Sequence, residues 1–289
     1  MKKIFVLSMM AMAMFSCQKE ELKPDQTQVT TRLKSTYNVS TESALRSAVA
    51  NAQPGDIINI SGTIYLTQTL QLLNSGTSSA KINITGGTNY ATLNCSGVSG
   101  WGVKVNGSYW NISYLNIEYA GNSGLVFQYG GYNWVYHVRT RGCGDTGLQI
   151  YNGSHNNSVN YCTSYDNYDV VNGGENADGF TCKLSGGAGN KFYKCNAKHN
   201  SDDGWDLYGQ PYTVVIDHCL SKNNGYGTNG DGNGFKLGSS GQNVPHTVTY
   251  CTADYNLAWG YDGNGNTGHI TTTGSGGTGN GKGLFTRIY

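Results

Sequence analysis

Charged residues are scarce in this chain of 289 residues: they make up 13% of the sequence, and the formal net charge is only +1. Such a chain lacks the basic surface that nucleic-acid binding requires, so we expect no nucleic-acid partner. Proline is also rare, at 4 residues, whereas glycine is abundant, at 42. Because the glycines follow no collagen-like period and 11% of the residues are aromatic, the composition predicts a folded domain with many tight turns.

The chain also has no apolar run of the length that a transmembrane helix needs. The longest, Ile4–Phe15, is too short to span a bilayer and follows two lysines, as in an export signal. Cys17 comes directly afterwards and resembles the processing site of a bacterial lipoprotein; an ordinary cleaved signal peptide is the alternative. We expect a secreted protein or an outer-membrane lipoprotein of a Gram-negative bacterium. The expected segments are a signal peptide over residues 1–17, a polar linker over 18–36 and the folded domain over 37–289.

Cysteine pairs of the Cys-x-x-Cys type are absent, so a zinc site is not expected. Seven cysteines follow Cys17, and an odd number cannot be fully paired. Four of them occupy the same position of a repeated segment: Cys162, Cys195, Cys219 and Cys251. We interpret these four as a stacked column of small buried residues, with disulfides or a metal site as the alternative.

The repeat predicts the fold. A glycine followed by leucine or an aromatic residue recurs at intervals of 23, 32, 25, 30 and 26 residues. After each glycine, every second residue is apolar, as at Phe180 and Cys182 or at Phe235 and Leu237. This period of two is typical of a strand with one buried face. Because no helical segment separates the copies, the spacing predicts an all-β, single-stranded parallel β-helix, a solenoid whose coils stack about 4.8 Å apart.

The two ends of the solenoid differ in sequence from its middle. Residues Ser40–Ala52 form an amphipathic pattern with Ser40 as the expected N-cap, which predicts a helix that covers the open end of the core. At the other end the repeat fades after His269, and Thr271–Lys282 is of low complexity. We expect the last coils or their cap to be incomplete, which would affect stability because terminal repeats need capping.

Alignment of the repeats at their glycines gathers residues that can carry chemistry. Asp178 and Asp203 precede the glycines of neighbouring copies, with Asp202 beside them, while Asp206 and Lys236 share an outward-facing position one coil apart. Carboxylates this close repel one another, and an all-oxygen cluster suits hard Ca²⁺. The alternative is that aspartate merely favours the bend before each strand.

Three segments around these residues resemble the signature segments of the pectate lyases of polysaccharide lyase family nine: Asn176–Phe180, Asp202–Leu207 and Gly232–Gly238. The resemblance spans residues 40–270 and is strongest over 175–240. It implies a right-handed parallel β-helix that acts on pectate. It also implies Lys236 as the catalytic base and a Ca²⁺ site formed by Asp178, Asp202, Asp203 and Asp206.

The implied reaction is β-elimination on polygalacturonate. Calcium on the C6 carboxylate would acidify the C5 proton, Lys236 would remove that proton, and the C4 oxygen would leave. A lysine acts as a base only when neutral, so the pKa of Lys236 must be lowered or the enzyme must work at alkaline pH. Lys183 is the second candidate base and a candidate substrate contact, with a solvated lysine as the alternative. Tyr208, on the same face as Asp206, is a candidate for stacking on a sugar ring.

Two other functions are compatible with the same fold. A polygalacturonase-like hydrolase would use paired carboxylates, for which Asp202 and Asp203 qualify, but the Gly-His-Gly and Arg-Ile-Lys segments of such hydrolases are absent. A non-catalytic β-helix that binds glycans at the cell surface would need no base. The aspartates together with Lys236 favour the lyase, which we expect to act on polygalacturonate or pectin as a monomer.

Overall fold

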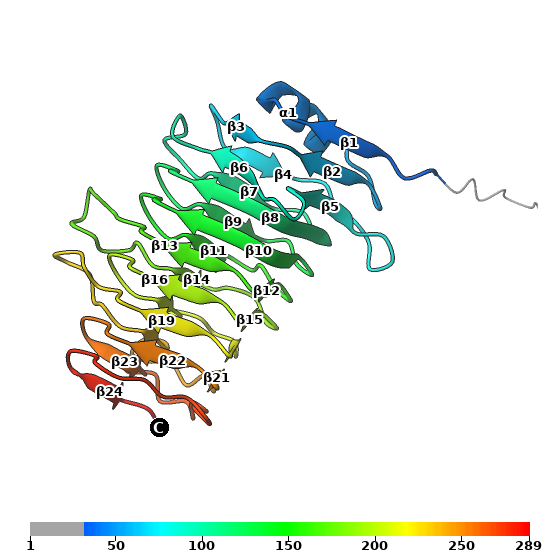
Figure 1. The fold of residues 1–289 in the computed structure, drawn as a ribbon. Coiled ribbons are helices and arrows are strands. Elements are labelled where there is room, and N and C mark those ends of the chain that lie inside the picture. Colours follow the sequence, from blue (N-terminus) through cyan, green and yellow to red (C-terminus); the bar gives the residue numbers. More distant parts are fainter. Residues whose placement is uncertain (1–31) are drawn as a thin grey trace, which may run out of the picture. The chain divides into compact units, whose positions relative to one another are not determined.

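The computed structural model describes residues 32–289, within which the β-helix unit spans Lys34–Tyr289. Its strands pair in parallel with the strands of the preceding and following coils, and the coils stack in chain order from β1 to β24 (Figure 1). The predicted parallel β-helix is therefore confirmed. The expected signal peptide over residues 1–17 and most of the expected linker over 18–36 lie outside the described residues, and the first strand begins at Thr36.

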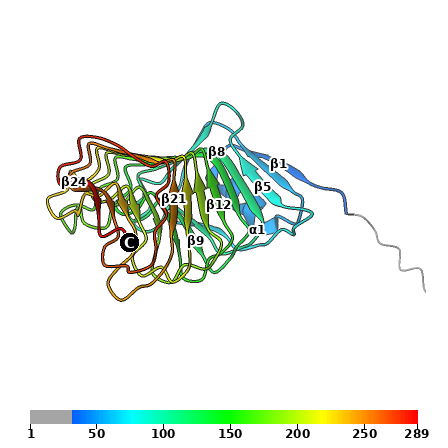
Figure 2. The same cartoon turned by 90° about the horizontal axis from the view of Figure 1, so that it is seen from below.

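The strands form two sheets, of 15 and nine strands. Strands of the larger sheet lie side by side in Figure 2. The larger sheet contains β1 (Thr36–Val39), β2 (Ile57–Ile60), β3 (Thr63–Tyr65), β5 (Ile82–Thr85), β6 (Ala91–Asn94), β8 (Trp110–Glu118), β10 (Trp134–Arg141), β12 (Ser158–Asn160), β13 (Thr163–Tyr165), β15 (Lys191–Tyr193), β16 (Asn196–Lys198), β18 (Val215–Asp217), β19 (Leu220–Lys222), β21 (Thr247–Thr249) and β22 (Thr252–Asp254). The smaller sheet contains β4 (Leu70–Leu72), β7 (Val103–Val105), β9 (Leu125–Gln128), β11 (Leu148–Tyr151), β14 (Phe180–Cys182), β17 (Trp205–Asp206), β20 (Phe235–Lys236), β23 (Trp259–Asp262) and β24 (Gly283–Thr286).

The predicted N-terminal helix is present as α1 (Glu42–Asn51) and buries Leu45, Ala48 and Val49 against the first coils. The expected N-cap was wrong by one residue. Thr41, not Ser40, has the extended backbone of an N-cap, and its side chain accepts a hydrogen bond from the Ala44 amide. Within residues 32–289 no helix is long and apolar enough to cross a membrane.

An aromatic stack fills the core beneath the smaller sheet. Neighbouring rings lie 4.8–4.9 Å apart between centroids, which is the spacing of the coils. The stacked residues are Phe180, Trp205, Phe235, Tyr261 and Phe285. The first four are fully buried, whereas Phe285, in the last strand, is 41% exposed. Because each comes from the same position of its coil, the period of two in the sequence becomes a continuous apolar column.

Two further columns stabilise the turns. The cysteines at 162, 195, 219 and 251 are buried and free, as the stacked-column interpretation predicts, and the described residues contain no disulfide. Beside them runs an asparagine ladder in which each side-chain amide donates to the next, over 2.8–2.9 Å. Its members are Asn167, Asn200, Asn224, Asn256 and Asn280. The ladder satisfies polar groups that would otherwise be buried without partners.

The low-complexity segment after His269 continues the solenoid. Thr271 and Gly276 form parallel bridges to the coil before, and β24 pairs with β23 in register. The expectation that the repeat fades here holds for the residue pattern but not for the backbone. Backbone hydrogen bonds between coils do not depend on side-chain type, so threonine, glycine and serine suffice to extend the register.

A buried histidine predicts how stability depends on pH. His246 is fully buried; its Nδ1 accepts a hydrogen bond from the Val214 amide, and burial lowers its pKa from 6.5 to about 4. The unfolded chain therefore binds a proton between pH 6.5 and 4 that the folded chain does not, so stability falls as pH falls through this window. The difference between the pKa of His246 in the unfolded and the folded chain corresponds to about 3 kcal/mol of unfolding free energy. We expect H246Q to remove this part of the acid sensitivity in urea unfolding at about pH 7 and about pH 4.5. Equal losses of unfolding free energy in both proteins would contradict this assignment.

Candidate active site

The outward face of the smaller sheet carries an aligned row of polar residues. Thr181 of β14 pairs with Asp206 of β17, and Asp206 pairs with Lys236 of β20. The row is the one expected from the alignment at the glycines. Because side chains alternate across a strand, these residues point away from the core while the aromatic residues beside them point inward.

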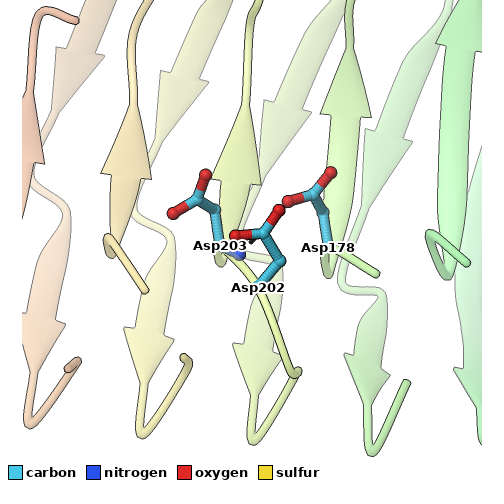
Figure 3. Close-up of side chains that lie close together, drawn as sticks. All are labelled: Asp178, Asp202 and Asp203. Carbon is cyan, nitrogen blue, oxygen red and sulfur yellow. Dashed lines mark hydrogen bonds between the residues drawn. The ribbon is translucent and has the colours of Figure 1, made fainter. Parts of the chain in front are cut away.

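Three aspartates lie at the bends that lead into these strands. One carboxylate oxygen from each of Asp178, Asp202 and Asp203 lies within 4.8 Å of the other two, and all three residues are buried. Figure 3 shows the three side chains close together. Asp178 and Asp203 come from neighbouring coils, since the amide of Gly179 donates to the Asp203 carbonyl. The structure thus brings together residues that the sequence places in separate repeats.

Backbone amides hold these carboxylates in place. Asp202 accepts hydrogen bonds from the amides of Asn176 and Asp231, at 3.1 and 2.6 Å. Oδ1 of Asp203 accepts from the amide and the side chain of Asn233, at 2.6 and 3.0 Å. Oδ2 of Asp203 is buried and accepts no hydrogen bond from the described residues. A buried carboxylate oxygen without a hydrogen bond is costly unless a cation approaches it, and the ammonium of Lys236 lies 3.4 Å from this oxygen.

Lys183 lies inside the cluster and is not the solvated lysine of the alternative interpretation. Its Nζ lies 2.9 Å from Asp178 Oδ2 and 3.0 Å from Asp206 Oδ2. Burial acts to lower the pKa of Lys183, but the two carboxylates raise it and prevail. The same ammonium, together with Lys236, outweighs the effect of burial on Asp206 and lowers the pKa of that carboxyl group.

Lys236 lies on the other side of the aspartates. Its Nζ is 2.6 Å from Asp231 Oδ2 and 3.4 Å from Asp203 Oδ2. Burial acts to lower the pKa of Lys236, but Asp203, Asp206 and Asp231 raise it and prevail. The carboxylates alone therefore keep the amine protonated.

Burial raises the pKa of Asp178, Asp202 and Asp203, and carboxylate neighbours raise it further. These carboxyl groups are therefore hard to ionise together unless positive charge is added. When ionised, Asp178, Asp202, Asp203, Asp206 and Asp231 carry five negative charges, and Lys183 and Lys236 carry two positive charges, which leaves a formal charge of −5 + 2 = −3. A divalent cation would reduce this negative charge, and the all-oxygen donor set suits Ca²⁺.

The cluster opens into a pocket of about 440 Å³. Tyr208 lies at this pocket with 49% of its surface exposed, in a position to meet a ligand. Sequence reasoning missed three acidic residues there: Asp145, Glu175 and Asp231. Glu175 and Asp231 belong to the two longest intervals between repeat glycines, and those lengths were the only signal that extra loops reach the site. The pocket is lined by Asp145, Gln149, Glu175, Asn176, Lys183, Leu184, Asp202, Asp206, Tyr208, Asp231 and Lys236.

Comparison with known proteins supports the resemblance to pectate lyases that these residues indicate. The family model of the Pel9A-like right-handed β-helix region matches residues 27–288, so the chain belongs to this family. Its coils are therefore those of a right-handed β-helix, as the resemblance implied.

Named relatives share this sequence at moderate identity. The chain is 35% identical over 269 residues to pectate lyase L of Paenibacillus polymyxa (strain SC2), an alignment that covers 83% of this chain and 60% of that protein. It is 37% identical over 177 residues to pectate lyase L of Dickeya dadantii (strain 3937), which covers 59% of this chain and 41% of the relative. The crystal structure of pectate lyase Pel9A matches with a TM-score of 0.76 and 31% identity, over 83% of this chain and 68% of the other. The chain thus spans less than two thirds of the length of these two sequence relatives.

Proposed function

We propose that this protein is a calcium-dependent pectate lyase that cleaves α-1,4-linked polygalacturonate by β-elimination. The observation that carries the proposal is an amine, Lys236, beside a buried cluster of aspartates at an open pocket. Relatives that are named pectate lyases support the substrate class.

Asp178, Asp202 and Asp203 would hold the calcium ion, because their oxygens converge and Oδ2 of Asp203 accepts no hydrogen bond from the described residues. Asp206, three residues after Asp203 on the same coil, would complete the negative site, although its two oxygens already accept hydrogen bonds from Lys183 and the Tyr208 amide. A calcium ion held there would supply positive charge that stabilises the negative charge developing on galacturonate during elimination.

Lys236 would remove the C5 proton. The proton would pass to Nζ, the C4–C5 double bond would form, and the C4–O bond would break as the leaving oxygen takes up a proton from solvent. Lys236 must be neutral for this step, and the neighbouring carboxylates raise its pKa. Activity should therefore rise toward alkaline pH, where more of the Lys236 amine is neutral. It should also depend on a cation that compensates the negative charge of the neighbouring carboxylates. Tyr208, exposed at the pocket, would contact a sugar ring. Lys183 is buried between two carboxylates and would contact only the edge of the substrate.

The products of the reaction test this proposal. Polygalacturonate incubated with the protein and Ca²⁺ should yield shortened chains whose 4,5-unsaturated ends absorb in the near ultraviolet. New reducing ends without this absorbance would instead establish a hydrolase, for which Asp202 and Asp203 are the candidate carboxylate pair. Binding to the polymer without a change in its length would establish the glycan-binding alternative.

We also propose that the protein is exported and acts as a monomer, with a lipid on Cys17 as its anchor. The basic and apolar residues of positions 1–17 support export. A polymeric substrate that cannot enter a cell fits the same location.

A further inference from the structure

We propose that the smaller sheet carries a second binding subsite for the polyuronate chain, on the coils that precede the candidate active site. Its members are Trp101, Lys104, Gln128 and Tyr151. The inference rests on the proposed function, because the subsite would hold another part of the polymer that the pocket cleaves. It would take one uronate unit, with aromatic rings against the sugar, a positive charge for the carboxylate and an amide for a hydroxyl group.

The subsite lies in line with the candidate active site. Lys104 of β7 occupies the same outward row as Asp206, four coils earlier. The register passes from Lys104 through Val126, Gln149 and Thr181 to Asp206. These four steps place Lys104 and Asp206 about 19 Å apart along the stack of coils. A ligand must therefore extend over several sugar units to contact both residues.

The pocket at the aspartates already extends along the stack toward this subsite. It is lined by residues of four successive coils, from Gln149 of β11 to Lys236 of β20. Tyr151 lies two residues after Gln149 and shares the outward face of β11. A polymer that leaves the pocket toward the N-terminal coils would thus reach Tyr151 next.

Aromatic rings and a cation meet at the subsite. The rings of Trp101 and Tyr151 lie 6.3 Å apart between centroids, edge to face. The Lys104 ammonium lies 4.8 Å from the centroid of the Trp101 ring. All three residues are partly exposed, whereas Val126, which lies outside the core on the outward row, is fully buried. The side chains therefore form a covered, partly apolar surface of the kind on which a sugar ring can pack.

Two polar groups of the subsite have no partner of opposite character. The Lys104 ammonium forms no ion pair with the described residues, unlike Lys183 and Lys236. Gln128 pairs with Tyr151 in the register and is 7% exposed, and its side-chain oxygen accepts no hydrogen bond from the described part of the chain. A buried acceptor without a donor is costly. A uronate unit would supply both partners, its carboxylate to Lys104 and a hydroxyl group to Gln128.

Kinetics with polygalacturonate test the subsite. K104Q should raise KM for the polymer about tenfold, the effect of losing a hydrogen bond to a charged group, with kcat unchanged. K104R keeps the charge and should resemble the wild type, as should the matched control K191Q, which changes an exposed lysine of the larger sheet. W101L should also raise KM, and W101F, which keeps an aromatic ring, should raise it less. Calcium should raise the melting temperature of K104Q as much as that of the wild type, because Lys104 lies about 19 Å from Asp206.

An unchanged KM in a folded K104Q or W101L would overturn the subsite. A loss of kcat or of the calcium response in K104Q would also overturn it, because Lys104 would then act on the active site itself.

Migration in native gels that contain polygalacturonate separates this inference from the proposed function. If the wild type produces no near-ultraviolet absorbance, the lyase proposal fails, but the polymer should still retard the wild type and K191Q more than K104Q. K191Q loses the same charge as K104Q, so the comparison isolates the position of the lysine. Equal retardation of K104Q and K191Q, or no retardation of the wild type, would overturn the subsite.

Discussion

K236Q is expected to lower the rate of polygalacturonate cleavage by about 10²- to 10⁴-fold, the range that a positioned acid or base contributes. Glutamine can still donate a hydrogen bond to Asp231, which lies 2.6 Å from the lysine Nζ, but it cannot accept the C5 proton. The loss should appear in kcat, measured as the initial rate of near-ultraviolet absorbance at saturating polymer, with little change in KM.

The matched control is K191Q, which changes an exposed lysine on the larger sheet and should keep full activity. Thermal unfolding of both variants shows whether the fold is preserved. A folded K236Q with the wild-type rate would refute Lys236 as the base, and Lys183 would be the next residue to test.

D203N is expected to abolish the stabilisation of the protein by calcium. A ligand that binds only the folded state at about 100 times its Kd stabilises by about 2.7 kcal/mol, and chelation should remove this gain together with the activity. The substitution keeps the size of the side chain but removes the negative charge shared by Oδ2 of Asp203, the buried oxygen that accepts no hydrogen bond from the described residues. Thermal unfolding with Ca²⁺ and with chelator measures the effect in each protein.

D166N provides the control for this experiment, because Asp166 lies on the surface and pairs with His199 rather than with the cluster. It should gain the same stabilisation from calcium as the wild type. Equal stabilisation of D203N and wild type would place the calcium ion elsewhere, and unchanged activity in excess chelator would exclude a calcium requirement.

Several features of the site followed from the residues alone. The glycine register placed Asp206 and Lys236 on neighbouring coils, and the structure pairs these two residues directly. It also placed Asp178 and Asp203 at successive bends, where their oxygens converge. This alignment was predictable because each coil of a parallel β-helix repeats the backbone of the coil before it, so equivalent positions stack.

Other features could not be derived in this way. Asp231 lies on a loop outside the repeat register, yet among the described residues it is the carboxylate nearest to Lys236. Lys183 has the outward parity of a solvated residue, but it is buried because carboxylates of two coils surround its amine. Loop paths and side-chain directions depend on contacts between coils, and no periodicity in the sequence records them.

The sequence by itself determined the coil architecture, the columns within it and the set of aspartates and lysines that share one face. These follow from local alternation and from the spacing of the glycines, because backbone pairing between coils transmits a one-dimensional pattern into three dimensions. Only the tertiary structure decided which carboxylate each lysine contacts, which aspartate oxygen remains without a hydrogen bond from the described residues, and how the loops close the pocket. Those outcomes depend on burial and on distances of a few ångströms, which set the charge balance of the site.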